Sequence, residues 1–127
     1  MADALAERAR ERDRLIGLGR TYVERLSRRR PVVAAAVVGS VARGDFNVWS
    51  DVDVVVVAES LPERAPARSG ALAEDVHGGV QPIGYTPAEF GEALARGNPL
   101  AREAVTTGVV LLGADFLRKS AEGPARS

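Results

Sequence analysis

Two aspartates separated by a single valine form the first chemically suggestive pattern in the chain. Asp51 and Asp53 stand at the start of an apolar run that extends to Ala58. Because residues two apart face the same side of a strand, the two carboxylates should project together while Val52 and Val54 point into the opposite layer. Adjacent carboxylates repel each other unless a cation lies between them, and Mg²⁺ held by one or two carboxylates plus substrate phosphates is a common solution. The spacing therefore predicts a magnesium site.

A glycine and a serine upstream of the aspartates predict a binding site for an anion, which would lie beside the metal. Gly39 and Ser40 end a second apolar run, Pro31 to Val38, and lead into a polar segment. A strand that enters a helical turn leaves backbone N–H groups free to bind an anion. Gly39 allows a phosphate to approach closely, the Ser40 hydroxyl adds a donor, and Arg43 supplies positive charge one turn later. With the aspartates, these residues are the equipment for phosphoryl or nucleotidyl transfer.

Each of these features also has a simpler structural interpretation. A lone Asp-x-Asp at a strand start is commonly a solvated turn, although the upstream Gly-Ser at matching spacing favours a site. Arg43 is equally compatible with a surface salt bridge to Asp45 or Glu59. Trp49 could stack on a base, but a partly buried loop anchor is the commoner use of such a residue. His77 is the single histidine of a chain without cysteine, and we assign it no role.

A long helix is predicted at the N-terminus, ahead of the first apolar run. Residues 3–29 repeat apolar side chains at helical spacing with arginine and glutamate on the outer face, so an amphipathic helix is expected within residues 1–30. The run Arg28-Arg29-Arg30 suits a helix C-terminus, where cations meet the negative end of the helix dipole. Pro31 then prevents the helix from continuing. This helix should pack its apolar face on a sheet.

The rest of the chain alternates between strand and helix. The expected elements are a strand over 31–38, a helical turn and loop over 41–50, a strand over 51–58, a mobile connection over 61–68, a helix over 69–77, a strand over 80–85, a helix over 86–96, a short helix from Asn98-Pro99, and an apolar strand or core segment over 107–112. Pro82 places the third strand at an edge, and Thr86 with Glu89 has the form of a capping box. Residues 118–127 are predicted to be a disordered tail. The alternation indicates one α/β domain over residues 1–127.

Composition excludes several classes of function. The chain has no cysteine, so disulfides, thiolate zinc sites and cysteine nucleophiles are excluded. Its 17 basic and 17 acidic residues give no overall field that would hold it on DNA or on an anionic membrane. Three Phe, two Tyr and one Trp are too few for a base-stacking platform, so nucleic acid is not an expected partner. No run approaches the ~18 apolar residues of a membrane span, and a cytoplasmic protein is expected.

The leading motif resembles the signature of a known family. Gly39-Ser40-Val41-Ala42-Arg43-Gly44 followed by Ser50-Asp51-Val52-Asp53 is similar to the signature of the polymerase-beta-like nucleotidyltransferases, and most resembles their minimal nucleotidyltransferase branch. The similarity continues through Tyr85-Thr86-Pro87-Ala88-Glu89-Phe90 and from Asn98-Pro99 to Gly108-Val109-Val110-Leu111-Leu112. It therefore covers nearly all of the chain after the first helix.

The resemblance implies a fold, a reaction and roles for single residues. The fold is a small mixed β-sheet flanked by helices, an α/β (α+β) arrangement. The reaction is the Mg²⁺-dependent transfer of a nucleoside monophosphate, AMP from ATP in the expected case, to a hydroxyl of a protein or small molecule. Ser40 would contact the triphosphate, while Asp51 and Asp53 would hold the metal and carry catalysis. Small members often work beside an all-helical HEPN partner, some as toxin and antitoxin pairs, and self-association is left open.

One position departs from the family pattern. The family has a third carboxylate on the next strand, and the matching position here is Gln81, an amide that is no base and is a poorer metal ligand. Two functions therefore stay open: an enzyme that takes the missing group from its acceptor or partner, and a catalytically weakened module that binds nucleotide or a HEPN-like partner. An aminoglycoside-modifying enzyme is a third interpretation, for which a chain this short leaves little room.

Overall fold

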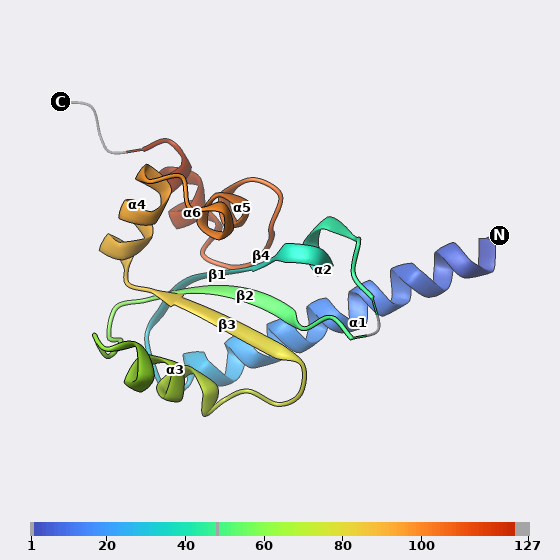
Figure 1. Ribbon diagram of the computed structural model, residues 1–127, viewed down its shortest axis with the longest axis horizontal. Coiled ribbons are helices and arrows are strands. Elements are labelled where there is room, and N and C mark those ends of the chain that lie inside the picture. Colours follow the sequence, from blue (N-terminus) through green and yellow to red (C-terminus); the bar gives the residue numbers. More distant parts are fainter. Residues whose placement is uncertain (1, 48, 124–127) are drawn as a thin grey trace.

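The computed structural model describes residues 2–47 and 49–123, which form a four-stranded sheet with helices on both faces (Figure 1). The elements are α1 (Ala2–Ser27), β1 (Val32–Val38), α2 (Gly39–Arg43), β2 (Val52–Ala58), α3 (Ala65–Ala73), β3 (Val80–Tyr85), α4 (Pro87–Ala95), α5 (Pro99–Val105), β4 (Val109–Leu112) and α6 (Ala114–Ala121). This is the α/β alternation that the sequence predicted. The sheet is mixed, as the family resemblance implied.

The order and direction of the strands bring three segments of the chain to one end of the sheet. The order is β3-β2-β1-β4, with β1 antiparallel to β2 and to β4, and β2 parallel to β3. The antiparallel pairing places the end of β1 beside the start of β2. The parallel pairing places the start of β3 beside the start of β2. The Gly-Ser motif, the two aspartates and Gln81 therefore meet in space.

Both faces of the sheet are covered, which explains why β1 and β2 are uninterrupted apolar runs. On one face, Val52, Val54 and Val56 of β2 belong to the core that α1 closes with Leu15 and Leu26, among others. On the other face, β2 presents its intervening valines to α4, α5 and α6. Burial from both sides fixes β2 within the centre of the sheet.

The N-terminal helix is amphipathic as predicted, but only its second part packs on the sheet. Its buried side chains run from Leu15 to Leu26, and Tyr22 donates a hydrogen bond to the carbonyl of Leu72 at 2.9 Å. Leu5 is 72% exposed, and the first turns project beyond the sheet (Figure 1). The apolar stripe of the helix is therefore longer than the core against which it was predicted to pack.

No helix among the described residues is long and apolar enough to cross a membrane.

Three boundaries of the predicted elements are wrong. The helix expected over 69–77 is α3, which starts four residues earlier and ends four residues earlier, at Ala73. Its early start is possible because Pro66 occupies the first turn, where proline needs no hydrogen-bond donor. The tail expected over 118–127 is helical as far as Ala121, since Phe116 and Leu117 pack on the helical layer. Residues 124–127 lie outside the described part of the chain.

The predictions for β3 and α4 are confirmed. β3 lies at the edge of the sheet and accommodates Pro82 there. Thr86 and Glu89 form the predicted capping box, in which each side chain accepts a hydrogen bond from the other residue's backbone N–H. Asn98 caps α5 in a similar way through the N–H of Ala101.

Candidate active site

The register between β1 and β2 fixes the position of Asp53. Asp53 lies opposite Val38, the last residue of β1, on the face of β2 that is turned toward α5. Its Oδ2 is so close to Gly39 that a Cβ atom added there would stand 2.5 Å from it. Asp51 is exposed just before β2. The strand geometry therefore brings the Asp-x-Asp and Gly-Ser motifs into direct contact.

Asp53 is a half-buried carboxylate that stands among other negative charges. Burial raises the pKa of the Asp53 carboxyl above its ordinary value, and the negative charges of Asp51 and Glu103 raise it further. The Arg43 guanidinium opposes this rise. A bound divalent cation would stabilise the charged form of such a group. The acidic pair thus fits a metal ion.

The donor set fits one metal in particular. Within residues 2–47 and 49–123, no group of three or more acidic, histidine or cysteine side chains is arranged to hold a metal ion. Asp51 and Asp53 would therefore leave most coordination positions to water and substrate oxygens. Mg²⁺ binds in this way, through one or two carboxylates and the phosphates of its nucleotide.

Gln81 lies beside Asp53 on the neighbouring strand. The parallel register of β2 and β3 pairs the two residues directly, and the Gln81 side chain is exposed. An amide therefore stands next to the half-buried Asp53, where the family resemblance places a third carboxylate. Its side chain can donate and accept hydrogen bonds, but it cannot take up a proton at neutral pH.

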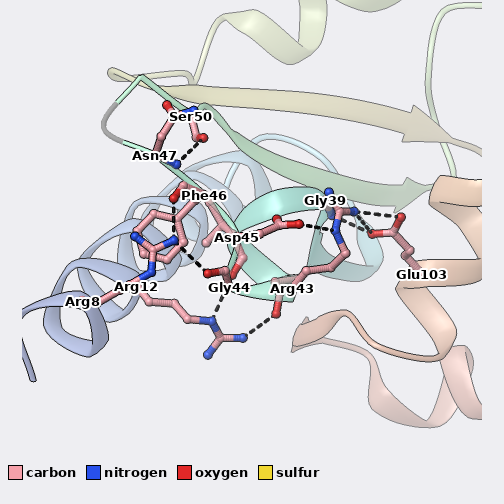
Figure 2. A network of polar contacts seen from close by, with 12 residues as sticks. Arg8, Arg12, Gly39, Arg43, Gly44, Asp45, Phe46, Asn47, Ser50 and Glu103 are labelled. Atoms are coloured by element: carbon pink, nitrogen blue, oxygen red, sulfur yellow. Dashed lines mark hydrogen bonds and ion pairs between the residues drawn. The ribbon is translucent and has the colours of Figure 1, made fainter. Parts of the chain in front are cut away.

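The backbone N–H of Gly39 is not free, contrary to what the sequence suggested. It donates to Oε1 of Glu103 at 2.8 Å, and Arg43 also reaches this carboxylate, with Nη1 3.3 Å from Oε2. Arg43 pairs in addition with Asp45 at 3.4 Å, which is one of the two salt bridges that its sequence context allowed. Glu103 comes from α5, and only the tertiary fold brings it to the Gly-Ser motif (Figure 2).

Two arginines of α1 hold α2 and the loop that follows it (Figure 2). Arg12 donates to the carbonyls of Val41 and Ala42 at 2.9 and 2.7 Å. Arg8 donates to the carbonyl of Phe46 at 2.6 Å, and its guanidinium lies 4.2 Å from the centre of the Phe46 ring. These contacts satisfy carbonyl groups at the end of a short helix. They fix the segment that carries Gly39 and Ser40.

Sequence reasoning missed Glu103, Arg8 and Arg12. The two arginines are four residues apart and so share one face of a helix, a signal that is equally typical of a solvated helix face. Glu103 gave no signal, since its partners lie 60 or more residues away in the chain. Trp49 is 89% exposed, so its interpretation as a partly buried loop anchor is wrong.

The comparisons with known proteins concern the same part of the chain. Residues 20–103 match the family described as nucleotidyltransferase domain, a range that includes both motifs, Gln81 and Glu103. The fold is similar to the crystal structure of a candidate nucleotidyltransferase from Sulfolobus solfataricus, with a TM-score of 0.61 and 22% sequence identity over 81% of this chain and 84% of that chain. A search among curated proteins gives no match.

Proposed function

Because the chain belongs to the nucleotidyltransferase domain family, we propose that it transfers AMP from ATP to a hydroxyl group of an acceptor, with Mg²⁺ as the cofactor. The acceptor is a protein or a small molecule. The observation that carries the proposal is the contact between the two motifs: the half-buried carboxylate of Asp53 lies against Gly39. A metal ion and a phosphate chain bound at these motifs would be neighbours.

The aspartates and the Gly-Ser segment have different roles in the proposed reaction. Asp51 and Asp53 hold the metal, while Gly39, Ser40 and Arg43 bind the triphosphate. When bound, Mg²⁺ supplies charge neutralisation at the phosphate oxygens. The acceptor oxygen forms a bond to the α-phosphorus, the bond from that phosphorus to the bridging oxygen breaks, and pyrophosphate leaves with the electron pair.

The proton of the acceptor hydroxyl needs a base that Gln81 cannot provide. Asp53 lies beside Gln81 but is assigned to the metal. The proton therefore leaves to water or to a group brought by the acceptor. A Gln81→Asp variant would restore a carboxylate next to Asp53 and should raise both Mg²⁺-dependent ATP binding and the rate of transfer.

The test is calorimetric titration of MgATP into four proteins. Wild type should bind, Gln81→Asp should bind more tightly, and the double variant Asp51→Asn/Asp53→Asn should lose binding. Asp115→Asn, at an exposed position on α6, removes one negative charge far from the motifs and should behave as wild type. Retained binding in the double variant, or its retained labelling of an acceptor by the nucleotide, would contradict the assignment of Asp51 and Asp53 to the metal.

A second candidate function is a partner-binding module that has lost efficient catalysis. The exposed amide of Gln81 beside Asp53 favours it. In this role the chain would hold a HEPN-like helical protein, as the antitoxin-like subunit of a pair. Complex formation should then survive Asp51→Asn and should not require ATP. Loss of the complex in that variant would count against this function.

A further inference from the structure

The contacts of Glu103 are those of an anion bound at the candidate site. Its carboxylate accepts a hydrogen bond from the backbone N–H of Gly39 at 2.8 Å and faces the guanidinium of Arg43 at 3.3 Å (Figure 2). These are two of the three groups that the proposed function assigns to the triphosphate. In this structure they hold a carboxylate of the same chain, whose side chain is 22% exposed.

The backbone of Glu103 is firmly fixed. Its carbonyl accepts hydrogen bonds from the N–H groups of Thr106 and Gly108, at 3.2 and 2.6 Å. Gly108 in turn is packed so closely on β1 that an added Cβ would lie 3.0 Å from the carbonyl oxygen of Val37. The end of α5 is therefore attached to the sheet, and the Glu103 carboxylate can leave Gly39 by rotation of its side chain.

Glu103 is not placed as a third metal ligand. Gln81 flanks Asp53 on the β3 side, whereas Glu103 reaches Gly39 on the β1 side. Its oxygens are directed at a backbone N–H and a guanidinium, and no set of three metal-binding side chains occurs in the part of the chain that the structure describes. Its negative charge also opposes that of Asp53. The two donors that hold the Glu103 carboxylate are the Gly39 N–H and the Arg43 guanidinium.

We propose that Glu103 is an internal competitor of the triphosphate, whose carboxylate occupies Gly39 and Arg43 until the nucleotide displaces it. The inference rests on the proposed function, because it takes these two groups as donors to phosphate. Two anions cannot share the same N–H group, so Glu103 must turn away when a phosphate enters. An anion with one charge gains little from this exchange. A triphosphate gains further contacts, at Ser40 and at the metal on Asp51 and Asp53, and is therefore selected.

The test compares Glu103→Gln with a matched control. Glutamine keeps the size of the side chain and can still accept from Gly39, but it lacks the negative charge that attracts Arg43. Glu92→Gln removes the same charge from an exposed ion pair with Arg96 on α4. Calorimetry with MgATP should give binding to Glu103→Gln on the order of tenfold tighter than to wild type, the factor that corresponds to one charge-assisted hydrogen bond. Glu92→Gln should bind as wild type does.

Glu103→Ala, which removes the competing acceptor altogether, should bind at least as tightly as Glu103→Gln. Circular dichroism melting of each variant shows whether the fold is retained. Where wild type binds MgATP, weaker or unchanged binding in both folded variants would overturn the proposal, and weaker binding would identify Glu103 as a ligand of the nucleotide or its metal.

Tripolyphosphate separates this proposal from the function on which it rests. If neither wild type nor any variant binds MgATP, the proposed function fails. Tighter binding of tripolyphosphate by Glu103→Gln than by wild type would then keep Glu103 as a competitor for polyphosphate anions. If Glu103→Gln binds tripolyphosphate no more tightly than wild type does, the proposal that Glu103 is a competitor fails as well.

Discussion

On the strand side of the candidate site, Asp53 and Gln81 are fixed by the register of β2 against its two neighbours. On the loop side, residues 39–47 are held by charged side chains that come from α1 and α5. The strand side rests on β2, whose valines are buried on both faces. The loop side depends on hydrogen bonds made by Arg8, Arg12 and Glu103.

This difference suggests a division of work within one small domain. A metal site needs carboxylates at fixed positions, which paired strands provide. A phosphate chain must enter and leave, and side-chain contacts that can open and close suit such a ligand. Charge-assisted hydrogen bonds contribute about 1.5–3 kcal/mol each, so a few such bonds supply much of the stability of the loop side. Single substitutions should therefore affect one side of the site and leave the other unchanged.

The largest effect is expected at Gly39, where the two sides touch. Its φ of +74° is strained for any other residue, and an added Cβ would meet Asp53 at 2.5 Å. Gly44 has a similar φ of +90°, but nothing lies within 4 Å of an added Cβ. Gly44→Ala should lower the free energy of unfolding by about 1–3 kcal/mol through backbone strain alone. Gly39→Ala should cost more and should also abolish MgATP binding.

Urea denaturation and calorimetry on these two variants measure both effects. The comparison between the two glycines removes the contribution of backbone strain, so the remainder reports the contact with Asp53. Equal losses of stability and of binding in the two variants would show that the sides of the site are not coupled through Gly39.

The second effect is expected at Arg12, on the loop side alone. Arg12→Ala removes both hydrogen bonds to the end of α2 and should lower the free energy of unfolding by at least about 1.5 kcal/mol, the lower value for one charge-assisted hydrogen bond. Hydrogen exchange should become faster in residues 39–47 and stay unchanged in β2. Arg14→Ala, which breaks only an exposed pair with Glu11, serves as the control. Faster exchange in β2, or none in the loop, would mean that Arg12 does not act locally.

The strand side could be read from the sequence because strand geometry is local. The alternation of Asp51 and Asp53 with buried valines follows from the two-residue period of a strand, and Val52 and Val54 do lie in the layer opposite to Asp53. The end of α1 and the strand after it followed from Pro31. The start of α3 and the existence of α6 were missed, since a proline in a first turn and a short polar helix resemble loops.

The loop side could not be read in the same way. Glu103 meets Gly39 across 64 positions of the sequence, and Arg12 meets Val41 across 29. Arginine and glutamate on a helix usually face solvent, so their types carry no signal of a distant partner. The N–H of Gly39 was expected to be free because an acceptor supplied by tertiary packing has no local pattern. The assigned roles of the site residues stay predictions.

A smaller effect is expected at the capping box of α4, which touches neither side of the site. Thr86→Ala removes the acceptor for the N–H of Glu89 and should lower the free energy of unfolding by about 1 kcal/mol. MgATP binding should not change. Thr107→Ala, at an exposed turn position, should leave both quantities unaltered. A loss of binding in Thr86→Ala would show that α4 contributes to the site.

The smallest effect concerns the ion pair between Arg68 and Glu89, which depends on charge as the loop side does but lies away from the motifs. The hydrogen bond from Arg68, followed by that from the Thr86 backbone, holds the pKa of Glu89 below its ordinary value. A carboxyl whose pKa is lower in the folded state stabilises the fold above its unfolded pKa and loses this contribution as pH falls through the folded pKa. Because Glu89 is 42% exposed, Glu89→Gln should cost less than about 1 kcal/mol near neutral pH.

The pH dependence distinguishes this ion pair from the neutral part of the capping box. Urea denaturation of wild type and Glu89→Gln should show a difference that shrinks as pH falls from about 7 to about 3, where the wild-type carboxyl becomes protonated. The difference between wild type and Thr86→Ala should persist over more of this range, because a hydroxyl does not titrate there. A gap between Glu89→Gln and wild type that is independent of pH would assign the contribution of Glu89 to packing and neutral hydrogen bonding. In that case the ion pair would not share the dependence on charge of the loop side, and the contrast between the two sides of the site would be sharper.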